Sequence, residues 1–277
     1  MDIIESTELT RKYVGWSSSK ADTAAQCAMR FNRQYVQKVR EGLPRKNSDA
    51  LVGTAVHSIV EIVLAGRKVT GAMNSVLRDS ALTNDEVDRI TAYAPNIEKF
   101  LKRYKIYTQK HACKIPLLEK KLGVTITGKA TPYFGKDLFL RGVLDLCLLF
   151  KDNKTAVIID HKTGGTRDLS YYTKQFDSYV LLMKANYPEL QKIKIGINFL
   201  KEGILPFSKG VIDVTDIEPL LNKVINNINS ASANLTDLDK TTVSKLCNWC
   251  SYKHICPAHQ GGNVSCGSTK AENSTTV

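Results

Sequence analysis

The sequence has no apolar run close to the roughly 20 residues that a membrane-spanning helix needs. Its first residues, MDIIESTELTRKYV, lack the apolar core of a signal peptide. It contains no internal repeat and no G-x4-G-K-S/T motif, so a P-loop motor within the same chain is excluded. These absences predict a soluble, cytoplasmic protein that is not secreted.

The composition also excludes several classes of protein. Hydrophobic residues make up 43% of the chain and charged residues 24%, which is close to globular averages and unlike disordered, collagen-like or coiled-coil chains. A chain of 277 residues buries roughly three quarters of its unfolded surface, so it can form a full core without disulfides.

Positive charge is in excess, with 39 Lys and Arg against 27 Asp and Glu and a net charge of +12. Such an excess indicates a polyanionic partner, and nucleic acid is the leading candidate. Residues 101–150 hold ten basic and three acidic side chains, and Lys99 to Lys121 forms a basic stripe. The same stripe is also consistent with an ordinary solvated helix face.

Seven cysteines in an unsecreted chain favour reduced thiols over a disulfide framework. Three of them follow the spacing Cys247-x2-Cys250-x5-Cys256, which is typical of metal ligands. A tetrahedral site needs a fourth thiolate, for which Cys27 is the candidate. Cys113, Cys147 and Cys266 are interpreted as non-ligands.

Hydrophobic periodicity predicts an α/β fold. Helices are expected at about 23–40, 51–64, 172–187 and 217–233, with two or three more within 70–112. Strands are expected at 119–128, 137–150, 155–160 and 192–200, with an edge strand at 206–214. The polar segment 257–277 is expected to be disordered.

The segment GVLDLCLLFKDNKTAVIID predicts a tight hairpin that turns at Asp152 and Asn153. Paired positions then sum to 305, which places Asp145 opposite Asp160 with both carboxylates on one face. Like charges at this distance are unfavourable unless a cation neutralises them. Lys162 lies on the same face because strand side chains alternate.

Two carboxylates and a lysine suit phosphodiester hydrolysis, since carboxylate oxygens bind Mg²⁺ or Mn²⁺ and the metal lowers the pKa of a bound water. The competing interpretation is structural: Asp145 ends a strand, Asp160 begins a turn, and Lys162 is solvated. The apolar surroundings of Asp145 argue against it, because an uncompensated buried carboxylate costs several kcal/mol.

Four motifs follow one another along the chain: GTAVHSIVE at 53–61, RGVLDL at 141–146, IIDHKTG at 158–164 and QFDSY at 175–179. In this order they resemble the RecB-like branch of the PD-(D/E)XK nucleases. The resemblance covers about residues 23–256. It implies a restriction-endonuclease-like core, a mixed central sheet flanked by helices with a helical insertion at about 66–117, in a single domain over 1–256.

The resemblance also implies roles for individual residues. Lys162 would be the catalytic lysine, and the metal would be held by His57, Asp145, Asp160 and the main-chain carbonyl of His161. An imidazole ligand favours Mn²⁺ relative to an all-oxygen site.

Two further residues are implied to assist this site, and the role of a third is open. Gln175 and Tyr179 would place the DNA strand and the lysine, although without the resemblance they form an ordinary amphipathic face. Glu61, one helical turn after His57, is open between a metal ligand, a residue supporting the ligands and an exposed acid.

For the cysteines, the resemblance implies a [4Fe-4S] cluster on Cys27, Cys247, Cys250 and Cys256, with zinc as the alternative. The opening CAMRFNRQYV resembles a CPxxF-type motif in which Ala28 replaces the proline. Related nucleases with such a cluster include CRISPR-adaptation exonucleases, nuclease domains of bacterial double-strand-break repair complexes, and compact phage exonucleases.

The expected function is metal-dependent exonuclease action on DNA ends, mainly single strands, in recombination, repair or phage DNA processing, with or without a separate helicase or recombination partner. The setting would be a bacterial or phage-infected cell. The alternatives are a non-catalytic DNA-binding subunit of a helicase-nuclease or CRISPR-adaptation complex, and a zinc-stabilised protein adaptor.

Overall fold

The computed structural model describes residues 15–40, 48–78, 82–114 and 116–260. The chain forms two compact units, each described here by itself. Unit 1 comprises Met1–Ser18 and Arg45–Asn229, and unit 2 comprises Ser19–Pro44 and Ser230–Val277. The extent of a single domain over 1–256 stays a prediction. No helix in the described ranges is long and apolar enough to cross a membrane.

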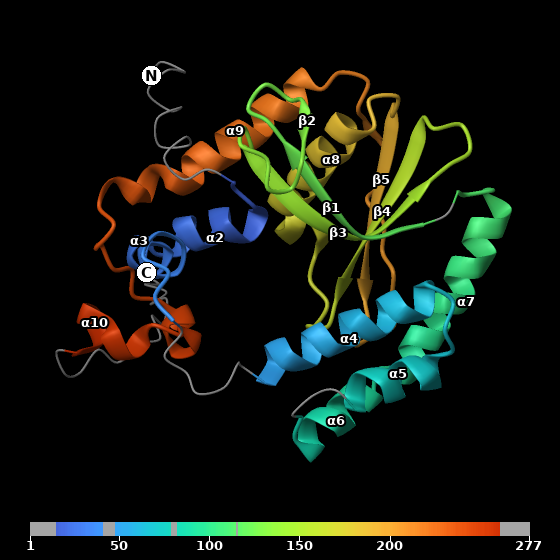
Figure 1. The fold of residues 1–277 in the computed structure, drawn as a ribbon, viewed down its shortest axis with the longest axis horizontal. Helices are drawn as coiled ribbons and strands as arrows, with labels where there is room; N and C mark the ends of the chain where they lie inside the picture. Colours follow the sequence, from blue (N-terminus) through green and yellow to red (C-terminus); the bar gives the residue numbers. More distant parts are fainter. Residues whose placement is uncertain (1–14, 41–47, 79–81, 115, 261–277) are drawn as a thin grey trace, which may run out of the picture. The chain divides into compact units, whose positions relative to one another are not determined.

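Unit 1 is built on a mixed six-stranded sheet with the strand order β2-β1-β3-β4-β5-β6 (Figure 1). Only β4 and β5 pair in parallel, and the other neighbours are antiparallel. This confirms the predicted mixed sheet. The strands are β1 (Leu117–Val124), β2 (Ala130–Thr131), β3 (Leu140–Leu149), β4 (Thr155–Lys162), β5 (Lys192–Phe199) and β6 (Ile212–Asp213).

The β3–β4 hairpin has the register predicted from its turn. Leu146 pairs with Ile159 and Leu149 with Ala156, so paired positions sum to 305. Asn153 has a φ of 58°, a conformation that asparagine tolerates better than most residues. The local turn chemistry therefore sets which residues of the two strands face one another.

The edge at β6 is shorter than expected. The sequence predicted a strand over 206–214, but only Ile212–Asp213 forms one, and Phe207 makes an isolated bridge to Gly196. Strand β2, two residues long, was not predicted. Both differences arise at sheet edges, where pairing depends on the neighbouring strand rather than on local pattern.

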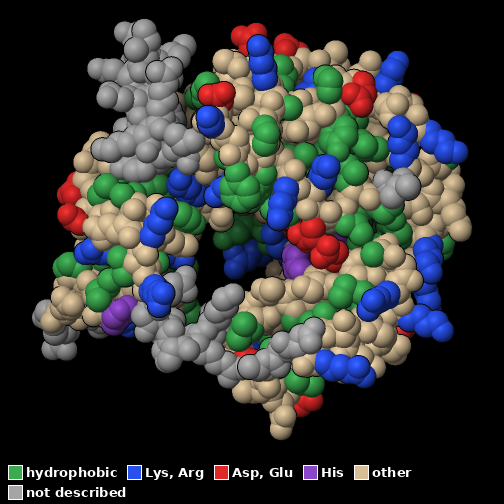
Figure 2. Space-filling view, viewed as in Figure 1, with side chains coloured by type: hydrophobic (Ala, Val, Ile, Leu, Met, Phe, Trp, Pro, Cys, Tyr) green, Lys and Arg blue, Asp and Glu red, His purple; other side chains and the backbone are tan. Residues whose placement is uncertain are grey.

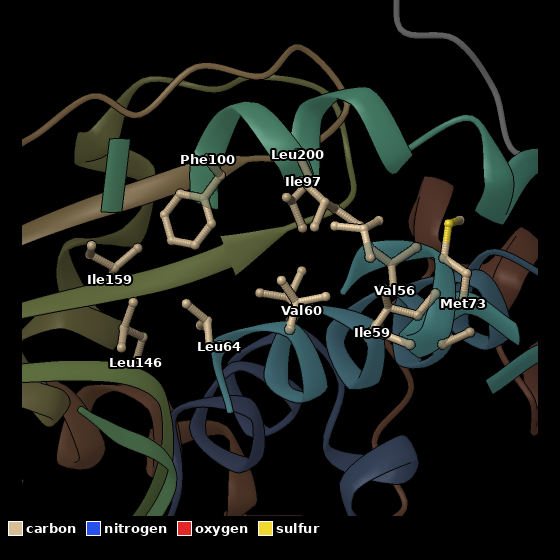
Figure 3. Packing of buried hydrophobic residues seen from close by; sticks show 14 of the residues in the cluster. Val56, Ile59, Val60, Leu64, Met73, Ile97, Phe100, Leu146, Ile159 and Leu200 are labelled. Carbon is tan, nitrogen blue, oxygen red and sulfur yellow. The ribbon is translucent and has the colours of Figure 1, made fainter. Parts of the chain in front are cut away.

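Helices on one side of the sheet form a continuous apolar core (Figure 3). They are α4 (Ser48–Leu64), α5 (Val69–Arg78), α6 (Asn84–Thr91) and α7 (Ala94–Lys110). Val60 of α4 and Phe100 of α7 belong to the same cluster as Leu146 and Ile159 of the sheet. The last three helices confirm the helices predicted within 70–112. Helix α4 is thereby fixed against the strands that carry the acidic residues.

Helix α8 (Thr173–Asn186) packs against β1 and β3, and the short 3-10 helix η2 (Leu169–Tyr172) leads into it (Figure 1). Leu182 of α8 lies so close to Gly142 that a Cβ there would be 2.7 Å from its Cδ1. Glycine on β3 thus allows α8 to approach the sheet closely. Helix α9 (Glu218–Ser232) follows β6.

In unit 2, the prediction of one continuous helix over 23–40 is wrong. The segment forms α2 (Ser18–Gln26), α3 (Ala28–Phe31) and the π-helix η1 (Asn32–Val36). Cys27 lies between the first two, with extended angles of φ −164° and ψ 117°. The N–H of Met29 donates to the carbonyl of Lys240 at 3.1 Å. A partner over 200 residues away therefore helps to compensate the interruption, and local periodicity cannot reveal it.

The end of the described chain is also more ordered than predicted. After α9 it forms the 3-10 helices η3 (Ala233–Thr236), η4 (Lys245–Trp249) and η5 (Lys253–Ile255), and the short helix α10 (Pro257–Gln260). The expectation of disorder from 257 onward is thus wrong for Pro257–Gln260. The rest of that segment, including Cys266, lies outside the described residues.

Candidate active site

Five polar side chains of unit 1 come from four elements that meet at one place. His57 is on α4, Glu119 on β1, Asp145 on β3, and Asp160 and Lys162 on β4. Each is electrostatically coupled to other members of the group. On the face drawn in Figure 2, acidic side chains and a histidine lie together.

Ligand atoms of three of these residues lie close enough to share one cation. One imidazole nitrogen of His57 and one carboxylate oxygen each of Glu119 and Asp145 lie within 4.8 Å of one another. The distance from Nδ1 of His57 to Oδ2 of Asp145 is 3.5 Å. One imidazole and two carboxylates are a suitable donor set for Mn²⁺ or Mg²⁺. The residues present therefore fit a divalent cation.

Glu119 is the member that sequence reasoning missed. The β1–β3 register pairs Leu118 with Leu146 and Lys120 with Leu144, which places Glu119 across from Asp145. Its φ of 43° is unusual for a residue other than glycine, and such strain concentrates at functional sites. An acidic residue at the start of a predicted strand was visible in the sequence, but only strand pairing brings it to Asp145.

Asp160 is held by one ion pair and two hydrogen bonds. Lys162 Nζ lies 2.7 Å from its Oδ2, and the hydroxyl of Tyr179 and the amide of Gln175 each donate to its Oδ1 at 3.2 Å. Gln175 Nε2 also donates to the Tyr179 hydroxyl at 2.7 Å. Helix α8 thus brings both residues predicted from QFDSY to the acidic strand.

The ammonium group of Lys162 is held in place but does not use all of its hydrogen-bond donors. Its ammonium also donates to Oε1 of Gln175 at 3.3 Å, and the side chain is 28% exposed. A lysine has three N–H donors, so at least one remains besides the contacts to Asp160 and Gln175. That donor is available to a phosphate oxygen or a water molecule.

Burial and mutual repulsion change the protonation of the acidic residues. Burial, and then the nearby Asp160 carboxylate, raise the pKa of Asp145 to about 7. Burial and the Asp145 carboxylate raise the pKa of Glu119. Burial lowers the pKa of His57, so its imidazole is neutral at pH 7 and can act as a ligand. A divalent cation would relieve the same repulsion that raises these two carboxyl pKa values.

The remaining predicted residues lie around this group. The His161 side chain is 3% exposed, and its burial lowers its pKa to about 3, so the ring is neutral. Its Nδ1 accepts from the Asn198 amide at 3.1 Å, while the main-chain N–H of His161 donates to Asp145. Glu61 is exposed and is not part of the three-residue group among the described residues.

Four cysteines of unit 2 line one pocket. They are Cys27, Cys247, Cys250 and Cys256. Cys256 is electrostatically coupled to the other three. The break between α2 and α3 places Cys27 at the start of α3, and the N–H of Ser244 donates to the sulfur of Cys247 at 3.3 Å. The structure therefore brings together the four cysteines that the sequence singled out.

Two other cysteines lie away from this pocket. Cys147 is buried on β3, and its burial raises its pKa to about 12. Cys113, in unit 1, forms an isolated antiparallel β-bridge with Phe150 through the main chain. Neither lines the cysteine pocket.

A cation site formed by strand carboxylates, with a lysine two residues after the second acid, is the arrangement of a metal-dependent nuclease fold. The chain belongs to the PD-(D/E)XK nuclease superfamily, whose family model matches residues 15–257. This establishes the superfamily that the motifs indicated, while the RecB-like branch remains an expectation.

Two solved structures are similar over most of the chain. One is described as a "putative exonuclease" from Eubacterium rectale, with 12% identity, a TM-score of 0.48, and 98% of this chain and 96% of that chain covered. The other is SSO0001, with 13% identity, a TM-score of 0.39, and coverage of 92% and 97%. At these values neither similarity supports a statement about activity. No curated protein matches the chain in sequence.

Proposed function

We propose that the protein is a divalent-metal-dependent deoxyribonuclease that hydrolyses phosphodiester bonds from a DNA end. The observation that carries this proposal is the convergence of the His57, Glu119 and Asp145 ligand atoms within 4.8 Å, electrostatically coupled to the Asp160–Lys162 pair. Membership of a nuclease superfamily supports it independently. A non-catalytic DNA-binding subunit would not need this arrangement.

In this proposal, His57, Glu119 and Asp145 hold the cation, with Asp160 and the His161 carbonyl completing the site. When bound, the cation supplies a water of lowered pKa and stabilises negative charge on the phosphate. The free N–H of Lys162 orients the water or donates to the phosphate. Asp160 and Gln175 hold that ammonium in place, so it need not be ordered when the substrate arrives.

Binding of the DNA backbone falls to basic side chains on the surface of unit 1. Helix α7 overlaps the basic stripe predicted from the sequence and exposes five of them: Lys99, Lys102, Arg103, Lys105 and Lys110. Such contacts bind phosphates without regard to sequence and weaken as salt increases. They favour general processing of DNA over recognition of one site.

We propose further that the four cysteines hold a [4Fe-4S] cluster with a structural role. Four thiolates can hold either a [4Fe-4S] cluster or a single zinc ion. The four cysteines line one pocket of unit 2. The resemblance of their spacing to that of cluster-binding nucleases favours the cluster.

The deciding experiment is incubation of the purified protein with end-labelled linear DNA, single- and double-stranded, with Mn²⁺, with Mg²⁺ and with chelator. We expect metal-dependent release of label. Covalently closed circles of the same sequence are the control for the requirement for an end. If circles are cleaved at the rate of linear DNA, the enzyme is an endonuclease and the proposed requirement for a DNA end is wrong. If no DNA is cleaved with either metal, the proposed nuclease activity is refuted.

A further inference from the structure

Tyr171 is an aromatic side chain left in solvent beside the candidate active site. It belongs to η2 (Leu169–Tyr172), which connects β4 to α8, and it is 67% exposed. The guanidinium of Arg167 lies 4.5 Å from the centre of its ring. An aromatic ring held against an arginine, but otherwise open, presents a flat apolar surface next to a positive charge.

A series of ring contacts connects Tyr171 to the proposed catalytic lysine. The rings of Tyr171 and Tyr172 are edge to face, with centres 5.1 Å apart. Nζ of Lys162 lies 5.4 Å from the centre of the Tyr172 ring. The Tyr172 ring also packs at 6.2 Å against Phe176 and against Phe199, which are both buried. Tyr171 therefore rests on a neighbour that is anchored in the core.

The backbone around Tyr171 is held by local hydrogen bonds. Oδ1 of Asp168 accepts from the N–H of Ser170 at 2.8 Å, and the Thr173 hydroxyl donates to the Ser170 carbonyl at 2.8 Å. Upstream, Gly164 is exposed, and a Cβ there would meet no atom within 4 Å. The segment after Lys162 thus combines a fixed aromatic surface with open space for an approaching strand.

Building on the proposed deoxyribonuclease function, we propose that Tyr171, supported by Arg167, is a stacking platform for an unpaired base of the strand whose phosphate lies at Lys162. Every base offers a π-face, so such a platform binds single strands without sequence preference, at about 1–3 kcal/mol per base. A base inside a duplex is already stacked and paired and does not offer that face. The platform therefore gives the site a preference for single-stranded ends.

The test uses the full-length protein in chelator, where cleavage is blocked, and fluorescence anisotropy with three labelled probes: a single strand, the same strand with abasic positions, and a blunt duplex. We expect Tyr171→Ala to weaken binding of the single strand by about 5- to 150-fold. Binding of the abasic strand and of the duplex should change by less than twofold. Tyr171→Phe should bind like the wild type, because it keeps the ring.

Phe134 provides the matched control. It is 80% exposed and has the guanidinium of Arg141 5.3 Å from its ring centre, but no described ring contact connects it to Lys162. Phe134→Ala should leave single-strand binding within twofold. An equal loss with Phe134→Ala, a loss on the abasic strand equal to that on the normal strand, or no loss with Tyr171→Ala would overturn the platform.

The platform and the nuclease can fail separately. Tyr171 is exposed, so its replacement should leave the midpoint of urea unfolding unchanged. Tyr171→Ala should raise the single-strand concentration that gives half-maximal metal-dependent cleavage by a factor similar to its loss of affinity. If Tyr171→Ala cleaves DNA and binds single strands as tightly as the wild type, the stacking platform alone is refuted. If the wild-type protein binds single strands through Tyr171 but cleaves no DNA, the proposed nuclease activity alone is refuted.

Discussion

The main-chain N–H of His161 donates a 2.7 Å hydrogen bond to Oδ2 of Asp145. The same oxygen lies 3.5 Å from Nδ1 of His57. One carboxylate oxygen is thus fixed by β4 and faces helix α4, so the position of a proposed metal ligand depends on the register of the hairpin. A shift of one residue between the strands would reverse the faces on which these side chains lie.

Asp145 makes the stability of the metal-free protein depend on pH. Its pKa is about 7 in the folded protein against an ordinary value of 3.8, so the folded state binds a proton more tightly than the unfolded chain. The resulting stabilisation is complete below about pH 4 and is lost as the pH rises through about 7, with a slope of at most about 1.4 kcal/mol per pH unit. Urea unfolding in chelator at several pH values measures it.

The control for this pH dependence is Asp145→Asn, which cannot ionise. Its advantage in stability over the wild type should be largest above about pH 7 and should shrink as the pH falls towards about 5. A difference between the two proteins that is constant over this range would show that Asp145 is not the group responsible.

Glu119 should contribute directly to metal affinity. Glu119→Gln removes one of three ligand atoms that lie within 4.8 Å, so we expect Mn²⁺ affinity to fall by at least about 10-fold in titration calorimetry. Glu61→Gln is the matched control, because Glu61 is an exposed acid on the helix of His57. Equal losses in the two variants would indicate a general charge effect and exclude Glu119 as a ligand.

Lys162 should be needed for cleavage more than for binding. Lys162→Ala is expected to abolish hydrolysis while DNA affinity stays within a few-fold, since phosphate contacts are spread over many basic residues. Single-turnover cleavage and anisotropy separate the two effects. Lys174→Ala, which removes an exposed lysine from the start of α8, should retain cleavage. Undiminished hydrolysis by Lys162→Ala would remove the proposed mechanism.

The four-cysteine site should give the protein a colour. Anaerobically purified protein is expected to be brown, with broad absorption at about 400 nm. Cys27→Ala should bleach it and lower its stability, because the cluster needs all four thiolates. Cys113→Ala should leave the colour unchanged. A colourless protein with one tightly bound zinc would refute the cluster but keep the four-cysteine site. A Cys27→Ala variant as coloured and stable as wild type would refute that site.

The sequence by itself determined the elements whose cause is local. The Asp152–Asn153 turn predicted the hairpin register because a tight turn leaves few ways to pair the strands that it joins. The alternation of apolar residues predicted the long strands, and the 3.6-residue period predicted α4 and α8. The spacing of the late cysteines likewise indicated a common site, and the structure places them around one pocket.

Only the tertiary structure decided what depends on distant partners. Glu119 becomes a neighbour of Asp145 through the pairing of β1 with β3, and no local pattern marks an acid for that role. The helix predicted over 23–40 is interrupted at Cys27, where Met29 bonds to a carbonyl near the other end of the chain. Local propensity is worth a few tenths of a kcal/mol per residue, so partners of this kind override it.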